Sequence, residues 1–132
     1  MCIRGGGWTV KVTGTPSHSS QLFQPGVGAG AIYEAARILT GFYEALAGEP
    51  NLTFNPGAIL GGTDVTHDAF TASGTAFGKN NVVAEHATVT GDLRAITLPQ
   101  LEMARERMRF VTQPSHPHST ATIHSTDASD PY

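Results

Sequence analysis

The chain has 132 residues, a formal net charge of -3 at pH 7 and a single cysteine. This length corresponds to about one domain, and 39% hydrophobic residues suffice for one core of modest size. The low charged fraction, 14%, is atypical of a disordered polyelectrolyte. The slight acidity argues against nucleic acid as a partner, and one cysteine cannot form an internal disulfide.

The apolar stretches are short and interrupted by threonine, glycine and charged residues, so the sequence predicts no membrane-spanning segment. Residues 1–7 lack the apolar region of a signal peptide. We therefore expect no membrane partner. The compartment stays open, with the cytoplasm favoured over secretion.

The first half of the chain predicts a strand followed by a helix. Residues 8–13 alternate apolar and polar side chains, as a strand with one buried face does. Residues 29–47 repeat apolar residues at helical spacing, and Gly48 marks the end of the predicted helix. Gly41 lies inside this helix, which suggests a close approach to another element. The predicted buried stripe consists of Ile32, Ala35, Ala36, Leu39, Tyr43 and Leu46.

Two strands are predicted next. Residues 52–60 are strand-like, and Pro56 lacks the N–H of a ladder, which indicates an edge or a bulged strand. Residues 63–81 show no clear period and are interpreted as a long connection. Residues 82–96 alternate well and predict a central strand. The expected buried face of this strand consists of Val83, Ala87, Val89 and Leu93.

A second helix and a last strand complete the pattern. Thr97 and Gln100 fit a capping box before a helix over residues 98–112, and residues 119–126 predict a strand. The buried stripe of this helix is expected to contain Leu101, Ala104, Met108 and Val111.

The element order is therefore strand, helix, strand, strand, helix, strand. A split βαβ unit repeated twice is typical of the α+β ferredoxin-like fold, a four-stranded antiparallel sheet with both helices on one face. The first and last strands are then antiparallel neighbours, and both termini leave the same end. Such a domain is easily inserted into another. We treat residues 1–132 as one domain.

Few residues suggest chemistry by spacing alone. His116 and His118 resemble a metal clip but have no evident third ligand, and Cys2 stands in a segment expected to fray. The glycines of residues 26–30 lack the lysine and the spacing of a phosphate loop, so a turn into the helix is the simpler interpretation.

Three segments remain as candidates, although spacing alone favours a structural role for each. His18 stands among small hydroxyl residues after the first strand. A glycine-rich bend runs from Asn55 to Gly62. Residues 78–84 lead into a strand whose Arg94 lies on the polar side, where a guanidinium can bind a carboxylate with two hydrogen bonds.

Five motifs in a fixed order carry a family resemblance across about residues 8–126. They are TGTPSHSS, GAGAIYEAARIL, LTFNPGAILGGT, GKNNVVAEHATVTGDLRAIT and LEMAR. In this order they resemble the dimerisation (lid) domain of the zinc-dependent exopeptidase and amidohydrolase family, which includes glutamate carboxypeptidases, aminoacylases and desuccinylases. The glutamate carboxypeptidase branch is the most similar.

The resemblance implies roles for three residues. His18 matches a histidine that reaches into the partner's active site and stabilises a polarised carbonyl oxygen, a catalytic role. Arg94 matches an arginine that binds the substrate carboxylate, and Asn81 matches an asparagine that contacts substrate nearby. Ala84 stands where the family often has proline, and this leaves Asn80 as an alternative to Asn81.

The resemblance also implies what surrounds the chain. In the family this domain is inserted into a catalytic domain that holds two zinc ions, and it forms homodimers. None of the zinc-binding motifs is present here, so we expect an excised lid domain that is inactive alone, from an enzyme acting on a peptide or N-acyl amino acid. A stand-alone ferredoxin-like module that binds a ligand or regulates a partner is the alternative. An H-x-D motif encoded upstream would decide for the first.

Overall fold

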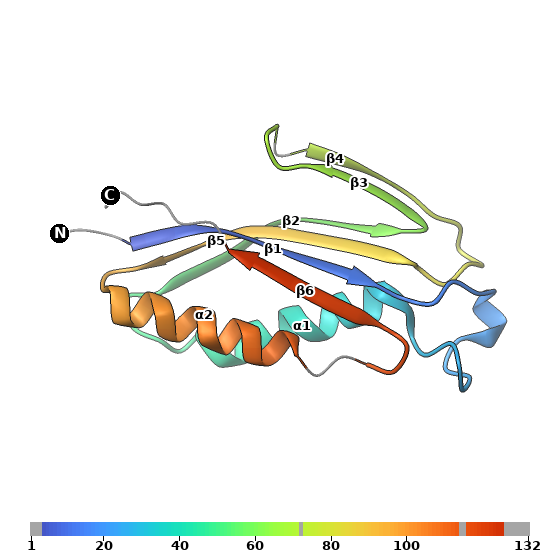
Figure 1. Cartoon of the computed structure of the whole chain (residues 1–132), viewed down its shortest axis with the longest axis horizontal. Coiled ribbons are helices and arrows are strands. Elements are labelled where there is room, and N and C mark those ends of the chain that lie inside the picture. Colours follow the sequence, from blue (N-terminus) through green and yellow to red (C-terminus); the bar gives the residue numbers. More distant parts are fainter. Residues whose placement is uncertain (1–3, 72, 114–115, 126–132) are drawn as a thin grey trace.

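The structure, a computed structural model, describes residues 4–71, 73–113 and 116–125. Figure 1 shows the elements, which in chain order are β1 (Arg4–Thr13), a short 3-10 helix η1 (Ser19–Gln21), α1 (Gly30–Leu46), β2 (Thr53–Gly62), β3 (Asp64–Asp68), β4 (Ser73–Phe77), β5 (His86–Ala95), α2 (Leu98–Thr112) and β6 (Thr120–Ser125).

The main sheet has four strands in the order β2-β5-β1-β6, and every neighbouring pair is antiparallel. Both helices cover one face of it (Figure 1). The predicted ferredoxin-like fold is therefore confirmed, and β1 and β6 are the antiparallel neighbours that it requires. Among the described residues, neither helix is long and apolar enough to cross a bilayer.

An aromatic cluster lies at the centre of the core. The Trp8 ring stacks on Phe54 with centroids 4.8 Å apart, and Phe42 meets both rings edge-on. The indole Nε1 donates to the Asp92 carbonyl oxygen at 3.1 Å, so the one polar atom of the ring is satisfied. Gly91 is required beneath this ring, because a Cβ there would lie 2.6 Å from the indole.

The predicted buried stripe of α1 is only partly correct. Ala35 and Leu46 are buried, but Ile32 is 50% exposed and Tyr43 is 72% exposed. The helix is rotated so that its buried face consists of Gly30, Ala31, Glu34, Ala35, Ile38, Phe42 and Leu46. The reason is that α1 is apolar on two sides, and spacing alone does not say which side packs under Trp8.

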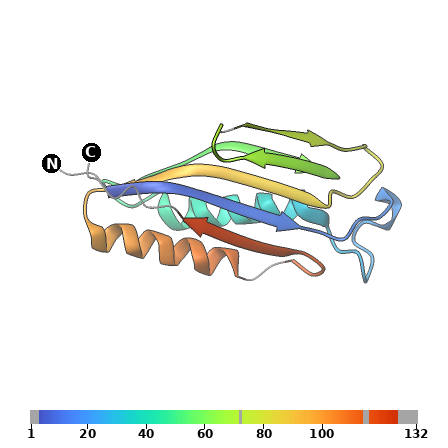
Figure 2. The same ribbon diagram turned by 45° about the horizontal axis from the view of Figure 1, so that its top comes forward.

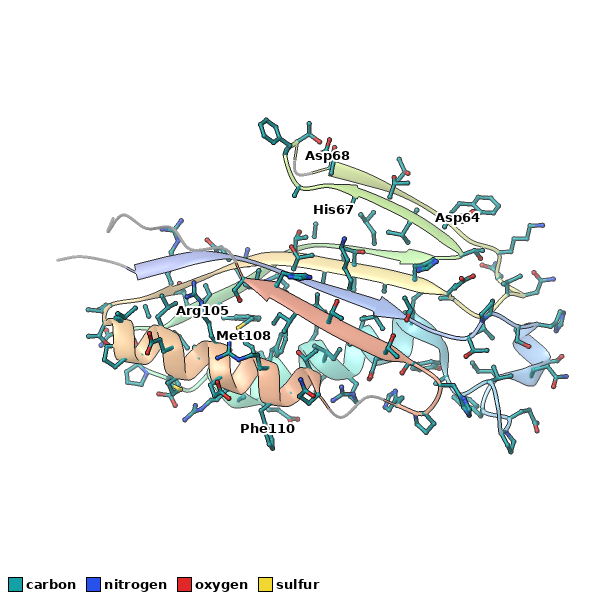
Figure 3. The ribbon with its side chains drawn as sticks, in the orientation of Figure 1. Asp64, His67, Asp68, Arg105, Met108 and Phe110 are labelled. Carbon is teal, nitrogen blue, oxygen red and sulfur yellow. The ribbon has the colours of Figure 1, made fainter. Side chains whose placement is uncertain are left out.

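The stripe predicted for α2 is confirmed at Leu101, Ala104 and Met108, all of which are buried. Met108 points between α2 and the sheet, whereas Phe110 projects away from it (Figure 3). Thr97 caps the helix by accepting from the Gln100 N–H at 3.3 Å.

The capping box is completed differently from the prediction. The Gln100 side chain donates to the Pro50 carbonyl oxygen at 2.7 Å, whereas in a capping box it accepts from the backbone N–H of the N-cap residue. α1 and α2 pack closely at Gly41. A Cβ at Gly41 would lie 2.5 Å from a methyl of Val111 in α2, so the expected close approach of α1 to another element is confirmed.

The prediction of residues 63–81 as an irregular connection is wrong, because this segment contains the β3–β4 hairpin. The hairpin lies on the side of the main sheet opposite the helices (Figure 2) and contacts β2 and β5. Its strands have five residues each and are largely exposed, so they leave little hydrophobic alternation in the sequence.

Two strand boundaries also differ from the prediction. β1 begins at Arg4 rather than residue 8, since three consecutive glycines form ladder pairs without any side-chain pattern. β5 begins at His86 rather than residue 82. The edge position and the irregularity expected for β2 are both confirmed, with a register shift between Pro56 and Ala58.

We predict that Gly41→Ala destabilises the chain by about 1 to 3 kcal/mol, because the added methyl overpacks against Val111. In a Val111→Ala background the same substitution should instead stabilise it by up to about 1 kcal/mol, the helix-propensity gain of alanine. Urea unfolding of the four proteins of this cycle measures both effects. Equal effects of Gly41→Ala in both backgrounds would contradict the contact.

Candidate functional site

The β1–β5 ladder brings two loops together at one end of the sheet. Its last pair is Thr13 with His86. Beyond it, the Gly14 N–H donates to the Glu85 carbonyl oxygen at 2.8 Å. The segment that follows β1 and the segment that precedes β5 therefore continue side by side past the end of the strands.

These loops carry His18 and Asn81. His18 forms an isolated antiparallel bridge with Val82, and the Ser19 N–H donates to the Asn81 carbonyl oxygen at 2.9 Å. The Val83 N–H donates to the Ser17 carbonyl oxygen at 2.8 Å. The two predicted site residues thus stand next to each other on backbones joined by hydrogen bonds, and both side chains are exposed.

The His18 ring is held in one orientation by the turn that follows it. Nδ1 accepts from the Ser20 N–H at 3.1 Å and lies 2.8 Å from the Ser20 hydroxyl oxygen, and His18 is the N-cap of η1. A backbone N–H can only donate, so Nδ1 must be the acceptor, and in the neutral imidazole the hydrogen is on Nε2. This leaves an N–H donor on the ring nitrogen remote from Ser20.

Arg94 lies at the other end of β5. It pairs with Gly5 of β1 and Thr53 of β2, and its Nε donates to Asp92 Oδ2 at 3.1 Å. It stands eight positions further along the strand than His86, which corresponds to roughly 26 Å. Within one chain the structure therefore brings His18 and Asn81 together and does not bring Arg94 to them.

A buried carboxylate supports the loops on the helix side of this end. Glu34 of α1 is fully buried and accepts from the side chain of Arg37 and from the His116 N–H at 2.9 Å. The Ser119 hydroxyl lies 3.5 Å from the same carboxylate. Sequence reasoning missed Glu34, because a glutamate in an amphipathic helix is normally a solvent-exposed residue.

The pair His116 and His118 also fastens loops together. His118 Nε2 accepts from the Gly26 N–H at 3.1 Å, and Gly26, Gly28 and Gly30 all adopt positive φ. The glycines of residues 26–30 thus form the turn into α1 that was the simpler interpretation of the sequence.

The described residues, 4–71, 73–113 and 116–125, contain no cluster of three His, Cys, Asp or Glu side chains able to hold a metal ion. The residues of this part of the chain therefore do not fit a zinc site. Cys2 lies outside the described residues.

Comparison with protein families gives one decisive match. Residues 5–119 match the family described as the peptidase dimerisation domain. The chain belongs to the peptidase dimerisation domain family. A search of curated proteins found no match.

Solved structures resemble this dimerisation domain along almost its whole length. A tripeptidase from Staphylococcus aureus matches 98% of the chain with a TM-score of 0.70 and 16% identity. A hydantoinase/carbamoylase family amidase from Burkholderia ambifaria matches 98% with a TM-score of 0.73 and 18% identity. An aminobenzoyl-glutamate utilization protein from Klebsiella pneumoniae matches 98% with a TM-score of 0.68 and 17% identity.

At these identities the likeness shows the fold alone. The dimerisation domain corresponds to only 30%, 29% and 30%, respectively, of these three chains. The remainder of each solved chain therefore has no counterpart in the 132 residues.

We predict that Glu34→Ala lowers the free energy of unfolding by about 2 to 3 kcal/mol, because the Arg37 side chain and the His116 N–H lose a charged acceptor. Glu44→Ala, at an exposed position of the same helix, should change it by less than about 0.5 kcal/mol. Urea unfolding monitored by circular dichroism compares the two. A loss of equal size in both variants would show that Glu34 has no special role.

Proposed function

We propose that this chain is the lid domain of a di-zinc metallopeptidase of the glutamate carboxypeptidase-like branch, and that it completes an active site whose metal-binding domain is not part of the 132 residues. The family match over residues 5–119 carries the proposal. The correspondence to about 30% of the solved chains supports the view that a larger enzyme contains this domain. The substrate is a peptide or an N-acyl amino acid, and the excised domain alone is inactive.

His18 acts in this proposal as a hydrogen-bond donor to the carbonyl oxygen of the scissile bond. Its Nδ1 is occupied by Ser20, so the neutral ring offers Nε2–H from an exposed loop. A donor that is already oriented costs little reorganisation when negative charge develops on an oxygen, and such a donor contributes strongly to catalysis. Asn81, on the adjoining loop, is placed to contact the same substrate.

Arg94 binds the substrate carboxylate, and its position implies that each active site contains residues from two protomers. The roughly 26 Å of strand between the two ends of β5 exceeds the length of an N-acyl amino acid. One protomer therefore does not place His18 and Arg94 on the same small substrate. A second copy of the chain supplies the missing group.

The dimer surface that fits best is the β2 edge together with the neighbouring side of α1. Among the described strands only β5 pairs with β2, so the outer edge of β2 has no strand beside it in this chain. Next to this edge, Ile59 of β2 and Ile32 and Tyr43 of α1 are 54%, 50% and 72% exposed. A two-fold contact would bury these apolar groups.

The opposite edge, β6, is a poorer candidate. It lies beside α2 (Figure 2), where half of the exposed residues are charged, namely Glu102, Glu106 and Arg109 beside Leu98, Pro99 and Phe110. Charged residues are depleted at the centres of stable interfaces. The exposed apolar side of α1 is also the part of the predicted stripe that the core does not use.

Pairing at the β2 edge reverses the direction of β5 in the partner. The Arg94 end of one protomer then lies alongside the end that carries His18 of the partner subunit. Three strand spacings separate the two β5 strands, or roughly 14 Å. This is about half the separation within one protomer, which supports an active site built from both copies.

We expect the chain to sediment as a dimer at high concentration. Ile59→Lys should raise the dissociation constant of this dimer by at least about tenfold, because a lysine would be buried at the centre of the contact. Phe110→Ala, which changes an exposed aromatic residue on α2, should leave the dissociation constant unchanged. Sedimentation equilibrium measures both. A chain that stays monomeric at the highest concentration contradicts the proposed surface.

The sharing of the active site is tested by complementation in the enzyme that contains this domain. His18→Ala and Arg94→Ala should each abolish most hydrolysis of an N-acyl glutamate. When the two variant dimers are mixed and exchange subunits, half of the dimers are mixed, and one of their two sites is intact. About a quarter of wild-type activity should then return, because about one site in four is intact and works at the wild-type rate. If no activity returns, His18 and Arg94 do not serve one site from two protomers.

A further inference from the structure

A hollow of about 370 Å³ lies between the loop that follows η1, the beginning of α1 and the turn before β6. It is lined by Phe23, Tyr33, His116 and Pro117 together with the small residues Gly28 and Ala29. None of the described residues that line it is an aspartate, glutamate, lysine or arginine. Its lining is therefore aromatic and apolar, with a single imidazole.

Phe23 is held in an unfavourable conformation at this hollow. Its φ is 70°, in the left-handed region that a bulky side chain rarely adopts. Phe23 is 68% exposed, so burial in the core does not offset this strain. The ring stands 5.9 Å from that of Tyr33 at an angle of 50°. A turn of this shape normally uses glycine or asparagine, so the phenyl group itself requires an explanation.

The backbone around the hollow is fixed from several sides. The Phe23 N–H donates to the Gly28 carbonyl oxygen at 2.8 Å. His118, which also has a left-handed φ of 63°, accepts from the Gly26 N–H through Nε2. The Thr15 hydroxyl donates to the His118 carbonyl oxygen at 3.2 Å. Phe23 and His118, both with a left-handed φ, thus lie in loops that are hydrogen-bonded to the same glycine-rich segment. Residues held in such conformations cluster at functional sites.

The fully buried carboxylate of Glu34 fixes the remaining wall. It accepts the His116 N–H at 2.9 Å, and His116 Nδ1 lies 3.7 Å from Glu34 Oε1. That Nδ1 atom is buried and has no hydrogen-bond partner among the described residues. The His116 ring is therefore seated against α1, with 38% of its side chain exposed at the hollow.

We propose that this hollow binds an uncharged aromatic or branched aliphatic side chain of a small peptide-like ligand. The hollow has room for one ring or one branched chain, and the exposed rings of Phe23 and Tyr33 favour contact with a third ring. Phe23, the first residue of its lining, stands five residues after His18. Its meaning as a substrate side-chain site rests on the proposed function, but binding is measured on this chain alone and can succeed or fail independently.

The test is a titration of the isotope-labelled 132-residue chain with N-acetyl-L-phenylalaninamide, followed by the backbone amide signals in NMR spectra. We expect millimolar affinity, with shifts concentrated at residues 23–33 and 116–118. N-acetyl-L-alaninamide at the same concentrations should give no such shifts. Phe23→Ala should weaken binding at least about fivefold, whereas Phe110→Ala, an exposed aromatic residue on α2, should leave it unchanged.

Three results would overturn the proposal. The first is shifts spread over the whole surface, and the second is an equal response to the alanine compound. The third is a Phe23→Ala variant that binds the probe normally but self-associates less, which would assign the hollow to the contact between two copies. If Phe23→Ala gives the spectrum of an unfolded chain, Tyr33→Ala replaces it with the same expected loss. The complementation experiment on His18 and Arg94 does not depend on this titration. Failure of the proposed hollow is therefore distinguishable from failure of the proposed function.

Discussion

The antiparallel pairing of β1 with β5 is the constraint on which the rest of the molecule depends. It joins ten residue pairs at the centre of the sheet. Because the strands run in opposite directions, the segment that leaves β1 and the segment that enters β5 emerge together, which is why His18 stands beside Asn81. The same pairing seats Trp8 over Gly91. The sheet therefore positions both the core and the exposed loops.

Periodicity in the sequence predicts most of this fold, because alternation and helical spacing report directly on which side chains are buried. The prediction failed where the sequence carries no such pattern. Consecutive glycines hide the first part of β1, and short exposed strands hide the β3–β4 hairpin. The rotation of α1 was missed for a different reason. Ile32 and Tyr43 are as apolar as the residues beneath the sheet, and only packing against the aromatic cluster selects between the two sides.

The candidate site was less predictable than the fold. His18, Asn81 and Arg94 were found by resemblance, since nothing in their spacing distinguishes them from ordinary loop and strand residues. The structure adds what the sequence lacks, namely that Ser20 fixes the His18 ring and that Arg94 lies at the far end of β5. Glu34 was invisible because its burial depends on a loop more than eighty residues later in the chain, whose amide and hydroxyl groups its carboxylate contacts.

The β3–β4 hairpin leaves the main sheet through a narrow neck, formed by residues 62–63 and 77–78, and this neck affects how such a domain can change in evolution. Gly62 and Gly78 abut where the hairpin leaves the main sheet, and the Thr63 N–H donates to the Phe77 carbonyl oxygen across this neck at 2.8 Å. The Gly62 carbonyl oxygen in turn accepts from the Glu85 N–H at 3.1 Å, just before β5. The residue before β5 is thus held by a hydrogen bond to the last residue of β2, and this bond does not involve the strands of the hairpin. Segments of different length can be spliced in at this point, or lost from it, while the register of the four central strands stays the same.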